Sequence, residues 1–274
     1  MKKLIFLLAL TLVALVACKE KKPADYTRLG FFTPYQNYME KLNGKVESIV
    51  EKGYWAVPEG DTYIKGAKVT KHDFDSIGWT YDYKAGFDID GDLVFCSVID
   101  ENDNVVYKWN LAKENNILAR AEYTKDDTVR TFIKITCNEV GKPIQFEVYN
   151  ALADTLLQTM KIEGSDINDT TIMQSHNFKG EAGGRGMAIY NEQGLLTNIE
   201  SYNKEGAYAG GIGIKYNERG FTSETTFLDK DKNVTGKNSF TYEYDDMGNW
   251  VKVICKDPDK GTTIISERVY TYFK

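Results

Sequence analysis

Histidine is almost absent from this sequence of 274 residues, which contains only His72 and His176. A Ser-His-Asp hydrolase needs a histidine and a serine in a sharp turn such as Gly-x-Ser-x-Gly, and the sequence has no such motif. The glycine-rich run 183–186 lacks the Gly-x-Gly-x-x-Gly spacing of a nucleotide-binding loop. We therefore predict no catalytic residue and a protein that is not an enzyme. Paired carboxylates of a hydrolase stay open, because they need only come together in space.

Cysteine is scarce as well, with four residues in the chain and none in a Cys-x-x-Cys pair. Cys96, Cys137 and Cys255 lie in apolar, strand-like runs, which leaves open either three buried thiols or one disulfide with a thiol left over. Acidic clusters occur at 88–92, 100–104 and 229–233, but turns select Asp, Asn and Gly for backbone reasons. The ligand spacing of zinc and calcium sites is absent, so we expect no metal and no cofactor.

Positive charge is not in excess, because 34 Lys and Arg stand against 40 Asp and Glu, for a formal net charge of −6. An acidic balance without a basic stripe argues against nucleic acid as a partner. Proline is rare too, with 5 residues, whereas 18 Tyr and 13 Phe help to raise the aromatic content to 13%. This composition is typical of a strand-rich globular protein.

Long apolar runs are missing except near the N-terminus, where Met1-Lys2-Lys3 precedes the apolar run 4–16, broken only by Thr11. As a helix this run would span about 20 Å, which is short of the roughly 30 Å hydrocarbon core of a bilayer. Lysines before a short apolar core are typical of an export signal. We expect residues 1–17 to be a signal peptide.

The expected signal ends in Leu15-Val16-Ala17-Cys18, which resembles the lipobox of bacterial lipoproteins. The resemblance implies cleavage before Cys18 and acylation of this cysteine, as with palmitate, so that the membrane becomes a partner through the lipid anchor. Lys19 in place of aspartate implies the outer membrane, by the sorting pattern of Gram-negative lipoproteins. Residues 18–32 are charged and carry a proline, which indicates a flexible tether ahead of a domain over 33–274.

A repeated unit organises this domain: an aromatic residue, then Asn or Asp, two free positions and a glycine. Tyr216-Asn217-Glu-Arg-Gly220 is a clear copy, and neighbouring copies start 12 or 14 residues apart. The Asn or Asp side chain bonds to nearby backbone to start a turn, and the glycine takes the positive φ that closes it. The predicted turn-forming glycines are Gly91, Gly141, Gly180, Gly194, Gly206, Gly220 and Gly248.

The turns separate stretches of about seven residues, enough for one strand of roughly 23 Å. Phe240, Tyr242 and Tyr244 alternate with polar residues, as a strand with one apolar face does. Short strands at regular spacing predict an all-β fold, an antiparallel meander of hairpin repeats in an elongated or rolled sheet. In two stretches, 104–130 and 150–175, the repeat pattern is irregular.

One short N-terminal helix is expected before the repeats. Thr33 and Pro34 read as its N-cap and first helical residue, an apolar stripe follows, and Gly44 is the stop signal. Residues 45–55 then read as the first strand, and we expect the helix to cover one end of the sheet.

The tandem Tyr-Asp/Asn-x-x-Gly units resemble the YD repeats of RHS-type proteins. The run 242–250, Tyr-Glu-Tyr-Asp-Asp-Met-Gly-Asn-Trp, is similar to uncharacterised RHS-like lipoproteins of Gram-negative bacteria. The resemblance covers roughly residue 83 to the end and implies a β structure built from repeats. In large RHS proteins such repeats enclose a toxin, and the copies in this chain are too few for that role.

These features predict a cell-envelope lipoprotein that acts as a non-catalytic binding or interaction module, with a protein or a glycan as partner. A purely structural envelope protein and a hydrolase with an unrecognised carboxylate site are the alternatives. Trp250, Tyr270 and Tyr272 near the C-terminus are candidates for an exposed aromatic row, because Tyr and Trp are enriched at binding hot spots. The competing interpretation places these rings in the core.

Overall fold

A computed structural model describes residues 42–77, 82–114, 117–139, 143–165 and 170–274. These ranges hold seventeen strands and the helix α2 (Lys71–Ile77). The first nine strands are β1 (Val46–Glu59), β2 (Thr62–Lys68), β3 (Tyr83–Phe87), β4 (Leu93–Ile99), β5 (Val105–Glu114), β6 (Ile117–Lys125), β7 (Thr128–Cys137), β8 (Pro143–Asn150) and β9 (Thr155–Ser165). The other eight are β10 (Thr170–Asn177), β11 (Ala182–Tyr190), β12 (Leu196–Tyr202), β13 (Tyr208–Tyr216), β14 (Thr222–Leu228), β15 (Val234–Tyr244), β16 (Trp250–Asp257) and β17 (Thr262–Tyr272).

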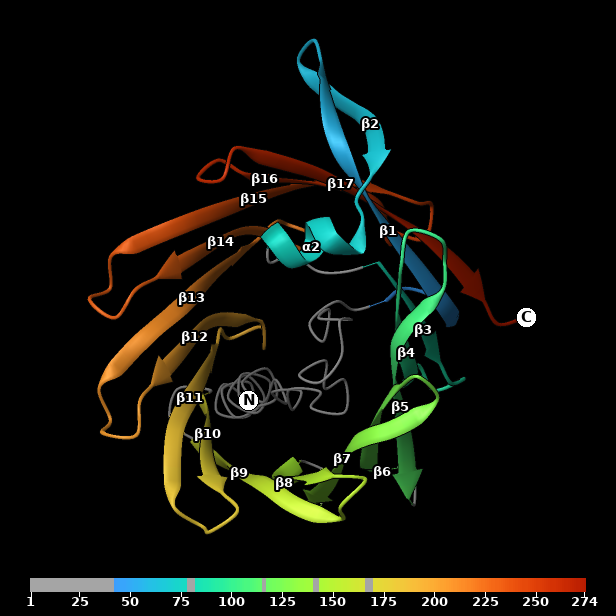
Figure 1. Cartoon of the computed structure of the whole chain (residues 1–274). Coiled ribbons are helices and arrows are strands. Elements are labelled where there is room, and N and C mark those ends of the chain that lie inside the picture. The colour runs from blue at the N-terminus through green and yellow to red at the C-terminus, as the bar shows by residue number, and fades with distance from the viewer. Residues whose placement is uncertain (1–41, 78–81, 115–116, 140–142, 166–169) are drawn as a thin grey trace, which may run out of the picture.

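Hydrogen bonding closes these strands into a barrel. From β3 to β17 each strand pairs antiparallel with the next one along the chain. β1 pairs with both β3 and β17, so that β1 and β3–β17 form a ring of sixteen strands (Figure 1). β2 forms a hairpin with β1 that extends beyond the ring.

The all-β class is confirmed, but the predicted elongated or rolled meander is wrong, because the sheet is closed. Closure depends on the pairing of β1 with β17, in which Val50 lies opposite Val269 and Glu51 opposite Arg268. The last two residues are 217 positions apart in the sequence, and no hairpin turn can specify so distant a pairing. Closure gives the backbone N–H and C=O groups of both terminal strands a partner, which an open sheet leaves exposed at its edges.

The predicted helix begins at Thr33, and its part up to position 41 lies outside the described residues. Gly44, its expected stop, is described and has a φ of +75°. The helix that the structure does describe, α2, begins with a reciprocal cap. Asp73 N donates to Thr70 Oγ1 over 3.2 Å, and Thr70 N donates to Asp73 Oδ2 over 2.9 Å. Within the described ranges no helix is long and apolar enough to span a bilayer.

The repeat units form the hairpin turns. In one of them Asn217 Oδ1 accepts hydrogen bonds from Arg219 N and Phe221 N, each 3.0 Å long, and Gly220 N donates to the Asn217 carbonyl over 3.0 Å. Positive φ values occur at Gly91, Gly180, Gly194, Gly206, Gly220 and Gly248. Gly141 lies outside the described residues. At the same place in two turns without glycine, Asp103 and Lys232 have φ values of +67° and +65°.

Exchanging residues at this turn position is expected to change stability through the backbone alone. Lys232→Gly should raise the free energy of unfolding by about 0.5–1 kcal/mol, because the left-handed region strains every residue with a Cβ. Gly220→Ala should lower it by about 1 kcal/mol, and a Cβ there would meet no atom within 4 Å, so contacts play no part. Urea unfolding of both variants measures this; a stabilising Gly220→Ala would contradict it.

Candidate functional site

The two faces of the barrel wall can be told apart by the contacts of α2. Phe74 of this helix packs with Ile264 of β17 and Trp55 of β1. Since α2 lies within the outline of the ring in Figure 1, these strand residues point inward. Alternate residues of a strand share a face, and residues directly opposite on neighbouring strands do too. The register therefore assigns every strand residue to an inner or an outer face.

The inner face is apolar around most of the ring. Ile49, Ala85 and Cys96 are 0% exposed and belong to one cluster across β1, β3 and β4. A second inner cluster joins Ala121, Ile133, Ile135 and Phe146 of β6, β7 and β8. A third joins Phe221, Trp250 and Val253, against which Phe240, Tyr242 and Tyr244 pack. A single sheet layer buries these side chains because they crowd on its concave side.

The outer face carries charged pairs instead. Glu224 of β14 binds Lys215 and Lys237 at 2.9 and 2.6 Å, so that one carboxylate links three strands. Glu243 and Lys252 pair at 2.8 Å on the next two strands. Charge on one face and apolar groups on the other place the solvated side of the wall outside.

Burial of the inner face is uneven. Ile133 and Phe146 are 2% and 1% exposed, whereas Ile199 of β12 and Ile212 of β13, farther along the ring, are only half-buried. Phe227 of β14, which lies opposite Ile212, is 37% exposed although it faces inward. The described side chains therefore leave apolar surface uncovered on the inner face of β12–β14.

A buried ion pair interrupts the apolar inner face. Arg268 Nε donates to Glu51 Oε2 over 2.8 Å, and Tyr83 Oη donates to the same oxygen over 2.7 Å. Arg268 Nη2 lies 2.8 Å from Tyr83 Oη, and the guanidinium stacks on Trp250, 3.7 Å from the ring centre. The side chain of Arg268 is 0% exposed, so this network holds two compensating charges away from water.

Two further inner-facing polar groups lack such partners. Asn238 of β15 lies directly opposite Thr225 of β14. Within the described part of the chain, Asn238 Oδ1 and Thr225 Oγ1 are buried without a hydrogen-bond partner. An unpaired buried polar atom is costly, so such atoms are uncommon outside functional places.

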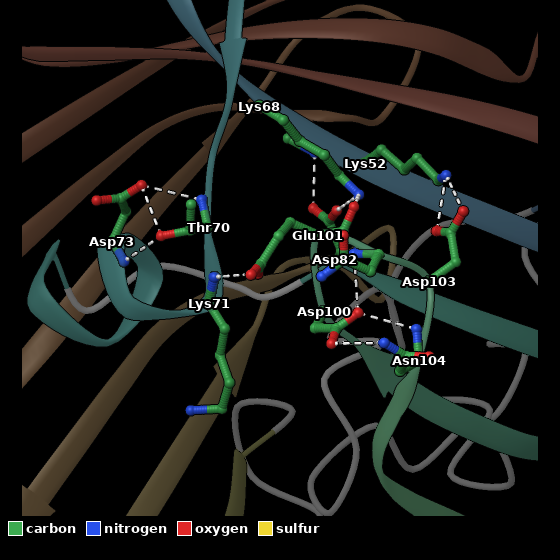
Figure 2. A network of polar contacts seen from close by, with 12 residues as sticks. Lys52, Lys68, Thr70, Lys71, Asp73, Asp82, Asp100, Glu101, Asp103 and Asn104 are labelled. Atoms are coloured by element: carbon green, nitrogen blue, oxygen red, sulfur yellow. Dashed lines mark hydrogen bonds and ion pairs between the residues drawn. The ribbon is translucent and has the colours of Figure 1, made fainter.

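A second polar network lies at the end of the barrel beside α2 and is shown in Figure 2. Lys52 Nζ pairs with Asp103 Oδ1 at 2.7 Å. Lys68 Nζ donates to the carbonyl of Glu101 over 2.8 Å and lies 3.4 Å from Asp82 Oδ2. These contacts tie the β1–β2 hairpin to the turn between β4 and β5.

Asp82 is the most deeply buried acid of this network, at 2% exposure. Its Oδ1 accepts a hydrogen bond from Gly53 N over 2.7 Å, and its Oδ2 receives none from any described group. Burial raises the pKa of Asp82 to about 6, although the Gly53 N–H and Lys68 act in the opposite direction. The ionised carboxylate is thus only partly compensated.

The candidate aromatic row is not an exposed surface. Trp250 is 3% exposed, beneath the Arg268 guanidinium. Tyr270 and Tyr272 are half-buried and point inward; Tyr270 Oη donates to the Trp250 carbonyl over 2.8 Å, and Tyr272 Oη donates to Asp245 Oδ2 over 3.1 Å. These contacts place the rings in the inner packing of the wall.

Sequence reasoning missed the Glu51–Arg268 pair, because neither residue belongs to a motif.

The remaining candidates fall into two groups. Cys18, the expected acylation site, lies outside the described residues. Cys96, Cys137 and Cys255 are free thiols, and burial raises the pKa of Cys255 strongly. No group of three metal-ligating side chains occurs within the described ranges.

No protein-family model matches the chain, so the likeness to RHS-type repeats stays a resemblance, and no curated protein matches it. A porin-like protein from Bacteroides uniformis is similar over 84% of this chain and 99% of its own, with 9% identity and a TM-score of 0.51. A porin-like protein from Bacteroides vulgatus matches over 83% and 98%, with 9% identity and a TM-score of 0.41. A LolA superfamily protein from Nitrosomonas europaea matches over 84% and 86%, with 8% identity and a TM-score of 0.22. The match to the Bacteroides uniformis protein shows that the chain shares its fold with a porin-like protein.

Proposed function

We propose that this chain is a lipid-anchored protein of the bacterial cell envelope whose barrel binds an apolar ligand on its inner face without catalysis. The observation that carries the proposal is the uncovered apolar surface of β12–β14, with Phe227 37% exposed on the inner side. Apolar surface that is kept inside a closed wall and left partly uncovered is typical of a ligand site. The sequence led us to expect a protein or a glycan as partner. The proposal keeps the binding role but assigns it to a ligand inside the barrel.

The proposed envelope location is supported by the N-terminal sequence and by the similarity to a porin-like protein. The lipobox-like run ending at Cys18 supports acylation, and Lys19 supports the outer membrane of a Gram-negative cell. The shared fold with a porin-like protein from Bacteroides uniformis supports an envelope protein. Two or more acyl chains suffice for stable anchoring, because each buried CH₂ contributes about 0.8 kcal/mol.

Acylation can be tested in cells. Wild-type protein is expected to enter the detergent phase on phase separation, and Cys18→Ala should shift it to the aqueous phase. Cys255→Ala, which removes a buried thiol of the barrel, is the matched control and should partition like the wild type. Equal partitioning of the wild type and Cys18→Ala would rule out the anchor.

Ligand binding can be tested by photocrosslinking from inside the barrel. A benzophenone amino acid at Ile212, on the inner face, should yield adducts whose added mass is that of a hydrocarbon-rich small molecule. The same amino acid at Thr226, on the outer face of the adjacent strand, is the control and should give none. If neither position yields a small-molecule adduct in cells, the barrel is a structural envelope component and not a binding protein.

A pore is the second candidate, favoured by the shared fold with a porin-like protein. The charged pairs of the outer face weigh against it. A Lys or Arg side chain on a lipid-facing wall costs about 2–4 kcal/mol at the bilayer midplane, and Lys215 and Lys237 lie with Glu224 on the outer face here. The ligand-binding proposal needs no such cost.

A further inference from the structure

Two facing polar groups mark one place on the inner wall. Asn238 and Thr225 lie directly opposite each other on β15 and β14, where opposed Cβ atoms are about 5 Å apart. Asn238 is 6% exposed, and neither its Oδ1 nor Thr225 Oγ1 has a hydrogen-bond partner in the described part of the chain. Two directly opposed residues therefore each hold a buried, unsatisfied polar atom.

The surroundings of this pair are mostly apolar. The next inner-facing residues are Phe240 along β15, Ile214 opposite Thr225 on β13, and Phe227 along β14. Phe227 is the exposed inner ring described above, so an apolar chain lying on it would end beside the polar pair. A ligand placed there would present a long apolar part and one polar end.

The charge nearby restricts the polar end further. Asp257 of β16, which also faces inward near this end of β15, keeps its Oδ1 bonded to Lys260 N at 3.0 Å in the turn that follows. Lys260 Nζ compensates this carboxylate only from 3.9 Å, so a carboxylate or a phosphate of the ligand placed beside it would still be disfavoured. A hydroxyl group fits, because it can donate to Asn238 Oδ1 and accept from the Thr225 hydroxyl at once.

We propose that Asn238 and Thr225 form the polar end of the inner-face ligand site and that the ligand is a neutral amphiphile with a hydroxyl group. This inference rests on the proposed binding function, and it adds the chemical class of the ligand. The two residues act as recognition groups, since a ligand hydroxyl satisfies both buried atoms together. A ligand of the same length without a donor leaves Asn238 Oδ1 unpaired.

The test uses the full-length protein in nanodiscs with two photoreactive probes, a diazirine-bearing dodecanol and its methyl ether. Labelling of the peptides around Phe227 and Asn238 is measured by mass spectrometry. We expect the alcohol to label wild-type protein about tenfold more strongly than the ether. In Asn238→Leu, close in shape to the original, this preference should fall toward one. Thr225→Val removes a donor from which both probes can accept, so it should weaken labelling by both probes and leave the preference in place. Thr241→Val, on the outer face of β15, should keep it.

Each outcome separates the two proposals. Equal labelling by both probes in the wild type overturns the polar end but leaves apolar binding intact. No labelling of the inner-face peptides by either probe overturns the binding function itself. A preference that survives in Asn238→Leu, or unchanged labelling by both probes in Thr225→Val, shows that other groups bind the hydroxyl and overturns the inference. Melting curves identify a variant that fails to fold; because each substitution removes an unpaired buried atom, we expect equal or higher melting temperatures than the wild type.

Discussion

Arg268→Met is expected to destabilise the barrel by about 3–5 kcal/mol, because it breaks a buried ion pair by removing one partner. The change removes the charge that compensates Glu51, whose Oε2 lies 2.8 Å from Arg268 Nε. It also leaves the Tyr83 hydroxyl with one partner fewer. The ionised Glu51 would then remain buried on the inner face without a counter-charge. Equilibrium unfolding in urea at pH 7 measures the loss.

The double variant Glu51→Leu with Arg268→Met is the control for this prediction. Removing both charges together leaves no uncompensated ion, so we expect the double variant to recover most of the loss. The outward-facing pair of Lys252 and Glu243 provides a second comparison, because Lys252→Met should cost less than about 1 kcal/mol at the exposed outer face. If Arg268→Met also lowered the free energy of unfolding by less than about 1 kcal/mol, the buried ion pair would not have the energetic role described here.

Asp82→Asn is expected to stabilise the protein at pH 7–8 by up to about 3 kcal/mol. The pKa of Asp82 in the folded state is about 6, against 3.8 for the ordinary carboxyl group, and one pKa unit corresponds to about 1.4 kcal/mol. Above pH 6 the wild type keeps a buried charge with incomplete compensation, and the amide removes that charge. The amide oxygen can still accept the hydrogen bond from Gly53 N.

The sign of this effect gives a pH signature. Because the folded state holds the Asp82 proton more tightly, the wild type gains stability as the pH falls from about 6 toward 4. The advantage of Asp82→Asn should therefore shrink through this window and vanish below about pH 4. Asp103→Asn is the control: Lys52 lowers the pKa of Asp103, so its loss should cost a little stability above pH 4. An advantage of Asp82→Asn that does not change with pH would refute the explanation.

Local structure could be read from the sequence where a glycine marks the turn. The copies at 217–220 and 245–248 combine an Asn or Asp with a positive-φ glycine, and both form the expected hairpins. The stretches 104–130 and 150–175 read as irregular, yet they hold β5, β6 and most of β9 and β10. Their turns use Asp126, Asp127 and Asp154 at positive φ, where the repeat pattern looks for glycine. Asp tolerates this conformation, so the turns exist without the signal.

The candidate site was much less predictable. The uncovered inner surface depends on the register that sets Ile212 opposite Phe227, and the polar pair depends on the register that sets Thr225 opposite Asn238. A shift of one residue would turn each of these side chains to the outer face. For Trp250 the sequence left an exposed row and a core position open, and the structure decides for the core, since the ring is covered by Arg268.

The sequence by itself determined the secondary structure class and the hairpin turns, because an Asn or Asp side chain and a positive φ act within five residues. It also determined the alternation of apolar and polar side chains, which separates two faces on every strand. Only the tertiary structure decided that the sheet closes and that the apolar face lies inside. The physical reason is distance: β1 and β17 meet because both otherwise expose backbone groups at an edge, and nothing local to either strand encodes the other.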